Sequence, residues 1–178
     1  MILDLTIFPV LTTGRLTLRR LGMNDAPEIK KLRSDKRVNE YLDRPGSITT
    51  REAKEFIQKI EKAISNNESA YWAITLTNED KLIGTICYWN ISLEKEMAEI
   101  GYELHPDFQG KGIMQEAILS VLKYGFDIMK IKTITALPLA ENKKSIQVLL
   151  KNHFREDATN KFVSKEEANG LAVYYLVQ

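Results

Sequence analysis

The chain has 178 residues, of which 44% are hydrophobic, and its 25 lysines and arginines against 24 aspartates and glutamates give a formal net charge of +1. This length favours one domain, and the balanced charge argues against disorder and against a protein that binds nucleic acid through bulk electrostatics. No apolar run approaches the roughly 20 residues that span a bilayer, and the N-terminus lacks the basic segment of a signal peptide. With the single cysteine, Cys87, these features predict a cytoplasmic protein that binds neither DNA nor a membrane, as a monomer or a homodimer.

The N-terminal half of the chain has the pattern of one strand followed by two helices. Polar and apolar residues alternate over Arg15–Leu21, as in a half-buried strand. A helix is expected next, because Pro27 is tolerated in a first helical turn. A second helix is expected from Thr49, which precedes Glu52 by the spacing of a capping box, and its apolar face extends to about Asn66.

The rest of the chain alternates strands and helices. Three strands are predicted in succession, over Tyr71–Thr77, Lys81–Trp89 and Met97–Leu104. The later elements are expected to be a helix from Ile113 to about Ile128, a strand over Ile131–Leu137, a helix over Asn142–Asn152, a weaker strand near Phe162 and a final strand over Leu171–Val177. The order β-α-α-β-β-β-α-β-α-β-β predicts an α/β fold with a mixed sheet flanked by helices.

A polar, glycine-bearing loop over Pro106–Gly112 leads directly into the long helix. Gly110 and Gly112 flank Lys111, so the backbone can bend and direct successive N–H groups and the positive end of the helix at one point. Such a nest binds anionic oxygen. The loop matches neither the P-loop motif nor the dinucleotide fingerprint, whose last glycine would fall on Gln115. An ordinary turn between a strand and a helix remains the alternative.

Segments around this loop resemble a known family. Gln109-Gly110-Lys111-Gly112-Ile113-Met114 resembles Q-x-x-G-x-(G/A), the pyrophosphate loop of the GNAT N-acetyltransferase superfamily, with Met114 where Gly or Ala is usual. Ala98-Glu99-Ile100-Gly101-Tyr102 and Asn142-Lys143-Lys144-Ser145 are similar to the RimJ/RimL ribosomal-protein N-acetyltransferase branch, and the likeness extends from about Leu11 to Val177. The resemblance implies one GNAT-like domain over residues 1–178 with a mixed, mostly antiparallel central sheet.

The resemblance also implies an enzyme that moves an acetyl group from acetyl-CoA to a primary amine, by direct attack in a ternary complex and without a metal. The acceptor it favours is a protein N-terminal α-amine, with ribosomal proteins among the candidates. The pyrophosphate is expected on the N–H groups of the loop, with a charge-assisted contact from Lys111, and the pantetheine arm on the strand near Leu104. The cofactor-binding residues expected are Leu104, Gln109, Gly110, Lys111, Gly112, Ile113, Met114, Asn142 and Ser145.

Two residues are candidates for catalysis. Glu99 matches the position where some family members carry a general base, and Ser145 matches the serine that the RimL-like branch places near the thiolate, where it would protonate or stabilise the sulfur. Glu103 shares the strand face of Glu99 by period two, so it remains an alternative base, as does water alone. A modest base suffices for an α-amine, whose pKa of about 7.7–8.0 leaves a useful neutral fraction near pH 7.

Other interpretations stay open. The tyrosine that many family members place seven residues after the asparagine falls on Leu149; its absence, together with Met114, favours a non-catalytic acyl-CoA-binding module. The acceptor of an enzyme could also be a polyamine, an amino acid or an aminoglycoside. For either a protein or a small-molecule acceptor, the acceptor site is expected in Asp35–Ser47 and the tail near Lys161–Asn169. Three aromatic residues are expected in the core, although the last could line the acceptor pocket: Trp72, Tyr102 and Trp89. His105 and His153, far apart in sequence, give no metal site.

Overall fold

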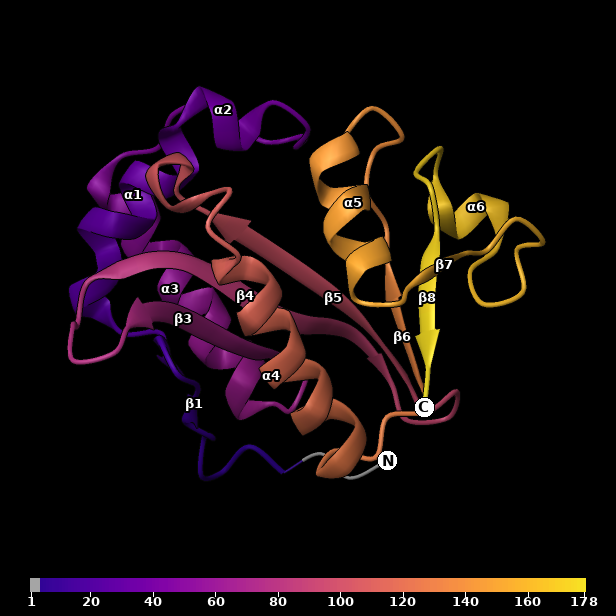
Figure 1. Cartoon of the computed structure of the whole chain (residues 1–178). Coiled ribbons are helices and arrows are strands. Elements are labelled where there is room, and N and C mark those ends of the chain that lie inside the picture. Colours follow the sequence, from indigo (N-terminus) through magenta and orange to yellow (C-terminus); the bar gives the residue numbers. More distant parts are fainter. Residues whose placement is uncertain (1–3) are drawn as a thin grey trace.

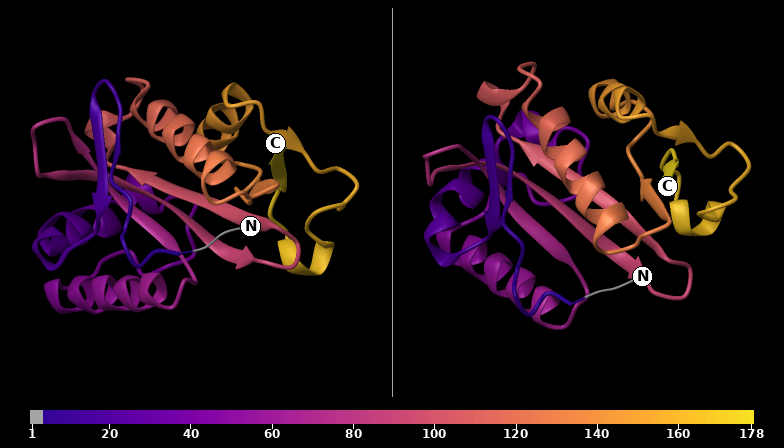
Figure 2. Two further views of the ribbon diagram at one scale, coloured as in Figure 1. Left: turned by 90° about the horizontal axis from the view of Figure 1, so that it is seen from below. Right: turned by 60° about the horizontal axis from the view of Figure 1, so that its bottom comes forward.

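The computed structural model describes residues 4–178 and contains one eight-stranded sheet in the order β1-β2-β3-β4-β5-β6-β8-β7 (Figure 1). Every neighbouring pair is antiparallel except β5 and β6, which are parallel. Helices α1 and α3 cover one face of the sheet, and α4 and α5 lie on the other (Figure 2). This is the mixed, mostly antiparallel α/β architecture that the sequence predicts.

The strands are β1 (Leu11–Thr12), β2 (Leu16–Arg20), β3 (Ala70–Leu76), β4 (Leu82–Ser92), β5 (Met97–Leu104), β6 (Thr133–Ala136), β7 (Arg155–Glu156) and β8 (Tyr174–Val177). The helices are α1 (Ala26–Ser34), α2 (Lys36–Asn39), α3 (Thr50–Ser65), α4 (Ile113–Asp127), α5 (Lys143–Lys151) and α6 (Lys165–Ala168), with short 3-10 helices at Met23–Asp25 and Pro106–Phe108. Among residues 4–178, no helix has the length and apolar character needed to cross a membrane.

The predicted order of the long elements is confirmed, but the tail differs. The strand expected near Phe162 is wrong, because residues 157–163 fold around the buried carboxylate of Asp157 instead. That carboxylate accepts hydrogen bonds from the backbone N–H groups of Lys161, at 2.9 Å, and Phe162, at 2.8 Å. The second strand of the tail is β7, ahead of this loop. Three further short elements were not predicted: β1, α2 and α6.

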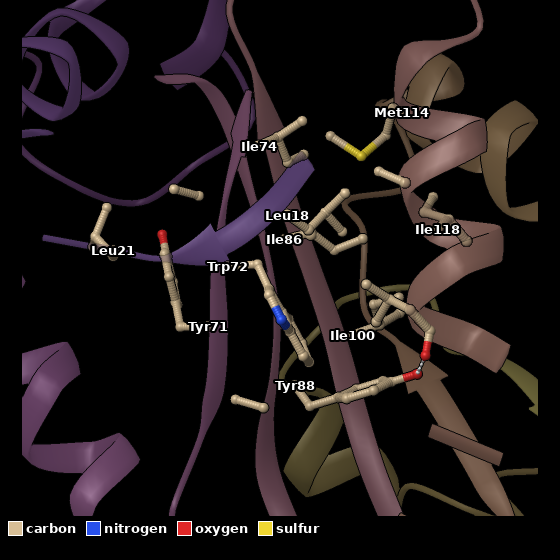
Figure 3. Packing of buried hydrophobic residues seen from close by; sticks show 14 of the residues in the cluster. Leu18, Leu21, Tyr71, Trp72, Ile74, Ile86, Tyr88, Ile100, Met114 and Ile118 are labelled. Atoms are coloured by element: carbon tan, nitrogen blue, oxygen red, sulfur yellow. Dashed lines mark hydrogen bonds between the residues drawn. The ribbon is translucent and has the colours of Figure 1, made fainter. Parts of the chain in front are cut away.

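Packing of aromatic side chains holds α4 against the sheet (Figure 3). Trp72, fully buried as predicted, contacts Tyr88 and Tyr124 edge-on, with ring centroids 6.3 and 5.8 Å apart. The Tyr88 hydroxyl donates to the backbone carbonyl of Val121 on α4, at 3.0 Å. Aromatic contacts of this kind are directional, so they fix the position of the helix as well as its burial. The N-terminus of α4 is thereby held at a defined point above the sheet.

The parallel pair β5 and β6 separates partway along its length. Met97–Glu99 pair with Thr133–Thr135, and β5 then continues to Leu104 while β6 ends at Ala136. Within residues 4–178, no strand pairs with Ile100–Leu104 on the side of β6. Backbone hydrogen-bonding groups that lack a strand partner must find another partner or water. The divergence therefore exposes a stretch of strand edge inside the fold, next to α5.

Candidate active site

A cavity of about 790 Å³ lies along the exposed part of β5. Its walls come from four segments that are distant in sequence: the end of β5, the loop before α4, the first turns of α5, and α2 with the residues after it. Of the two segments expected to hold an acceptor, Asp35–Ser47 contributes to these walls through residues such as Tyr41, and Lys161–Asn169 does not. The cavity therefore joins the glycine loop to one predicted acceptor segment.

The loop before α4 has the backbone geometry of an anion cradle. Gly110 and Gly112 have φ values of +74° and +73°, in the left-handed region that glycine adopts readily. Gly112 is the N-cap of α4, and no side chain caps this end. The first N–H groups of an α-helix have no partner within the helix, so those of α4 are left for a ligand. A Cβ atom added at Gly110 would meet nothing within 4 Å, which shows that the space beside the loop is open.

Met114, the residue that departs from the usual pattern, does not fill this space. Its side chain is 7% exposed and packs among core residues, pointing towards Ile74 and Leu18 of the sheet (Figure 3). The methionine side chain is therefore accommodated mostly beneath the helix, although the residue also borders the cavity.

Polar contacts brace the loop from outside. Arg15 donates through Nη1 to the Lys111 carbonyl, at 3.0 Å, and through Nε to Glu116 in the first turn of α4, at 2.7 Å. Gln109 donates through Nε2 to the Leu104 carbonyl, at 3.0 Å, which closes the end of β5. The ammonium group of Lys111 donates to the Asp107 carbonyl, at 2.8 Å. These contacts hold the loop in its curved conformation. The backbone N–H of Gln109 donates to the Pro106 carbonyl, at 3.1 Å, so the N–H groups left for a ligand begin at Gly110.

The start of α5 lies across the cavity from the loop. Asn142 accepts a hydrogen bond from the backbone N–H of Ser145 through its side-chain oxygen, at 3.1 Å, and so caps the helix. The Ser145 hydroxyl lies 2.9 Å from the hydroxyl of Tyr102 on β5. Tyr102 was expected in the core; instead it lines the cavity, and burial raises the pKa of its phenol to about 12. Sequence reasoning gave no signal for this pair of hydroxyl groups.

The two glutamates of β5 have different surroundings. Both carboxylate oxygens of Glu103 accept hydrogen bonds from Arg44, at 2.6 and 2.9 Å, and Arg33 lies 3.9 Å away. Glu99 is half-buried, and burial raises the pKa of its carboxyl above the usual value, although a 2.9 Å hydrogen bond from Asn90 opposes the shift. The partners of the two carboxylates therefore differ: two guanidinium groups engage Glu103, whereas the Asn90 amide and the Trp89 side chain contact Glu99.

Glu99 lies at the point where β6 separates from β5. Glu99 is the last residue of β5 that pairs with β6, opposite Thr135, and its side chain lies on the face of β5 opposite that of Tyr102. It is not part of the cavity walls, whereas the loop residues, Asn142 and Ser145 are. The structure thus brings the predicted binding residues together on one face of the exposed strand edge and places the predicted base on the other face. Trp89, predicted in the core, is 48% exposed and lies opposite Glu99 on β4.

The Arg44–Glu103 pair attaches the segment after α2 to the sheet, because both side chains are largely covered, at 10% and 17% exposure. Arg44→Met keeps the apolar stem and removes the charge. We expect it to lower the free energy of unfolding by about 2 kcal/mol, less than a buried pair often costs, since Arg33 remains beside Glu103. For a chain of this length that is a fall of roughly 4–8 °C in Tm by calorimetry.

The control for this prediction is Arg51→Met, which removes an exposed pair with Glu55 on α3. Exposed helical pairs contribute little, so its Tm should match that of the unchanged protein. Equal Tm values for the two variants would show that the Arg44–Glu103 pair does not stabilise the fold.

Among residues 4–178, no group of three or more His, Cys, Asp and Glu side chains is arranged to hold a metal ion. Cys87 is half-buried, and burial raises the pKa of its thiol to about 12. Such a thiol stays protonated at neutral pH and is a poor nucleophile. The cavity offers an anion cradle and a pair of hydroxyl groups, and the half-buried carboxylate of Glu99 lies on the other face of β5.

Comparison with known proteins identifies the family of the chain. Residues 15–155 match the family model of the acetyltransferase (GNAT) domain. The chain is 30% identical over 164 residues, 92% of each chain, to "Uncharacterized N-acetyltransferase p20" of Bacillus licheniformis. It is 33% identical over 76 residues, 43% of this chain and 42% of the relative, to the ribosomal-protein-serine acetyltransferase of Escherichia coli K12. The RimL ribosomal L7/L12 alpha-N-protein acetyltransferase in complex with coenzyme A has the same fold, with a TM-score of 0.81 at 19% identity over 95% of this chain and 98% of that one.

The chain therefore belongs to the GNAT acetyltransferase family. It is an N-acetyltransferase, and acetyl-CoA is its acetyl donor. The predicted resemblance, fold class, enzyme class and donor are confirmed.

Proposed function

We propose that the protein transfers the acetyl group of acetyl-CoA directly to the α-amino group of a protein N-terminus, in the cytoplasm. The observation that carries the proposal is the charge of the cavity walls, where three basic residues outnumber two acidic ones: Arg37, Lys144, Lys151, Glu40 and Glu103. Arg44 already neutralises Glu103, and Asp35 pairs with Arg37 at 2.7 Å. The charges left in the walls are therefore Lys144, Lys151 and Glu40. A polyamine or an aminoglycoside carries several positive charges and needs several free carboxylates, which these walls lack. An N-terminal α-amine carries at most one.

The relatives support a protein acceptor. The E. coli relative is named for acetylation of a ribosomal protein at serine, and the structure of matching fold is named for α-N-acetylation of ribosomal L7/L12. The acidity of an α-amine also supports a protein N-terminus as the acceptor, because a group with a pKa of about 8 needs only a modest base to lose its proton. A single half-buried carboxylate such as Glu99 provides that help.

The cradle fits the pyrophosphate of acetyl-CoA. The uncapped N-terminus of α4 and the left-handed glycines direct N–H groups into open space beside the loop, as an anion requires. The proposed binding residues are those predicted from the sequence, over Gln109–Met114 and at Asn142 and Ser145. The carbonyl of Leu104 already accepts a hydrogen bond from Gln109. Backbone hydrogen bonds to the pantetheine arm are therefore expected mainly from the residues of β5 that precede Leu104. The basic residues of the cavity walls suit the phosphates electrostatically.

The residues proposed for catalysis are Glu99 and Ser145. Glu99 accepts a proton from the attacking amine, directly or through a water molecule, while the nitrogen forms a bond to the acetyl carbon. Ser145 directs its hydroxyl proton to the sulfur, which keeps the electron pair of the broken carbon–sulfur bond. Cys87, with a pKa near 12, is not suited to carry the acetyl group in an intermediate step. The proposed reaction therefore proceeds by direct attack, with both substrates bound together.

Release of CoA thiol from acetyl-CoA, measured with a panel of amines, tests this proposal. The panel contains a peptide with a free N-terminus, the same peptide with that amine blocked and a lysine left free, a polyamine, an aminoglycoside and a free amino acid. We expect the free N-terminal peptide to have the highest kcat/KM by at least tenfold. Faster release with one of the small amines would overturn the protein acceptor. Binding of acetyl-CoA without release for any amine would indicate a non-catalytic acyl-CoA-binding protein.

The cradle itself can be tested with two glycines of equal backbone strain. Gly110→Ala forces a side chain onto a left-handed residue, at a cost of about 1 kcal/mol, and turns the N–H groups of the loop. We expect the Kd for acetyl-CoA to rise roughly tenfold by calorimetry, equivalent to about 1.4 kcal/mol. Gly170→Ala is the matched control, because Gly170 also has a left-handed φ of +83° and open space around it, but lies outside the cavity walls. Equal Kd values for the two variants would show that the loop does not bind the cofactor.

A further inference from the structure

Tyr102 and Ser145 bridge the two sides of the exposed strand edge. Tyr102 extends from β5, beyond the point where β6 leaves it, and its hydroxyl lies 2.9 Å from that of Ser145 in the first turn of α5. Both residues line the cavity. The same phenol lies 3.4 Å from the Ser145 backbone carbonyl, a longer and weaker contact. The short hydroxyl contact therefore decides how the two side chains are arranged.

The direction of this hydrogen bond follows from acidity. A phenol is a stronger hydrogen-bond donor than an aliphatic alcohol, and each hydroxyl group has one proton to give. Burial raises the pKa of Tyr102 to about 12, so the phenol keeps its proton throughout the working pH range. The 2.9 Å contact allows either hydroxyl to donate, and we assign the phenol, the stronger donor, as the donor to Ser145 Oγ. The proton of Ser145 is then left free to point at another acceptor in the cavity.

The rest of Ser145 is already fixed. Asn142 accepts from its backbone N–H, at 3.1 Å, which leaves only the side-chain torsion and the hydroxyl rotor undetermined. A serine side chain has three staggered rotamers of similar energy. The bond from Tyr102 selects the one that directs Oγ towards β5. Leu149, one helical turn after Ser145 on α5, is fully buried and carries no hydroxyl group.

We propose that Tyr102 is a positioning residue for acetyl transfer, which acts through Ser145 by holding its Oγ and freeing its proton for the departing sulfur. The proposal rests on the function of Ser145 proposed above. When the carbon–sulfur bond breaks, the sulfur keeps the electron pair and receives a hydrogen bond from Ser145, and the proton lost by the amine goes to Glu99. Tyr102 neither gains nor loses a proton in this sequence.

A double-mutant cycle on kcat tests the proposal, with thiol release as the measurement. Tyr102→Phe should lower kcat by roughly two- to tenfold, the contribution of one neutral hydrogen bond, and leave the KM for acetyl-CoA unchanged. In the Ser145→Ala background the same change should have no effect, because the residue through which Tyr102 acts is gone. Tyr71→Phe is the matched control: it removes a phenol that lies 3.0 Å from the Thr85 hydroxyl, away from the cavity, and should leave kcat unchanged.

Two results would overturn the proposal. One is an unchanged kcat for Tyr102→Phe. The other is a fall in kcat that persists in full in the Ser145→Ala background, as a purely structural contribution of Tyr102 would give. Slow thiol release to water, measured without any amine, involves the same departing sulfur and no acceptor. The same double-mutant cycle, repeated on this hydrolysis, separates the inference about Tyr102 from the proposed protein acceptor. If Tyr102 and Ser145 are coupled in hydrolysis but no peptide is acetylated, the proposed acceptor is contradicted and the inference about Tyr102 is upheld.

Discussion

Glu99→Gln is expected to lower kcat for acetylation of an N-terminal peptide by roughly a hundredfold or more, the range that a general base contributes. The amide keeps the shape of the side chain and its contact with Asn90 but cannot accept the proton of the amine. The KM for acetyl-CoA should change little, because Glu99 lies on the face of β5 opposite the proposed cofactor groove. The measurement is steady-state thiol release at saturating peptide.

The pH profile gives the same prediction a second readout. Burial raises the pKa of Glu99, and a base is active when ionised, so kcat of the unchanged enzyme should fall as pH drops through that raised value. This fall in kcat at low pH, the acidic limb of the profile, should be absent in Glu99→Gln. Glu94→Gln, which removes the same charge from an exposed turn residue, is the control and should retain both the rate and the limb. A limb that survives in Glu99→Gln and disappears in Glu103→Gln would transfer the base to Glu103.

Ser145→Ala is expected to lower kcat by roughly ten- to a hundredfold, because the departing sulfur loses its hydrogen-bond donor. Stability should change little, since the cap of α5 uses the backbone N–H of Ser145 and the side chain of Asn142, both of which remain. Affinity for acetyl-CoA, measured by calorimetry, should also stay within about twofold, because a single neutral hydrogen bond contributes little to binding.

The control for Ser145→Ala is Ser164→Ala. Ser164 caps the short helix α6 by accepting from Glu167, at 3.1 Å, outside the walls of the cavity. Its removal should lower stability by about 1 kcal/mol and leave kcat intact, the opposite pattern to that of Ser145. If Ser145→Ala instead lost stability and kept its turnover, the serine would be a structural residue and the sulfur would be stabilised by another group.

The long elements of the fold were predictable because their patterns repeat. Helix α3 has a capping box and an apolar face over several turns, and both appear in the structure. Helices α2 and α6 have four residues each, and β1 has two, which is too few for any period to show. His153, just after α5, has a φ of +65°, in the left-handed conformation that glycine favours, and its residue type gave no signal of this.

The site was predictable only where its residues are neighbours in sequence. Gly110 and Gly112 bend one loop, so their spacing alone indicated the cradle. The contacts that complete the site join distant parts of the chain: Tyr102 and Ser145 are 43 residues apart, and Arg44 and Glu103 are 59 apart. Glu99 and Glu103 lie on the same face of one strand, so the sequence pattern alone cannot distinguish their roles. Only the partners that folding brings to each carboxylate separate a structural carboxylate from a candidate base: two arginines for Glu103, and Asn90 and Trp89 for Glu99.

The most direct test of acetyl transfer without an enzyme-bound intermediate is the initial rate of thiol release, with acetyl-CoA and an N-terminal peptide varied together. Direct attack within a complex of both substrates predicts double-reciprocal lines that intersect, together with a protein mass that acetyl-CoA alone leaves unchanged. It also predicts that Cys87→Ala keeps full activity, because the thiol is protonated and takes no part. Parallel lines, with one acetyl group found on the protein and lost when peptide is added, would contradict direct transfer.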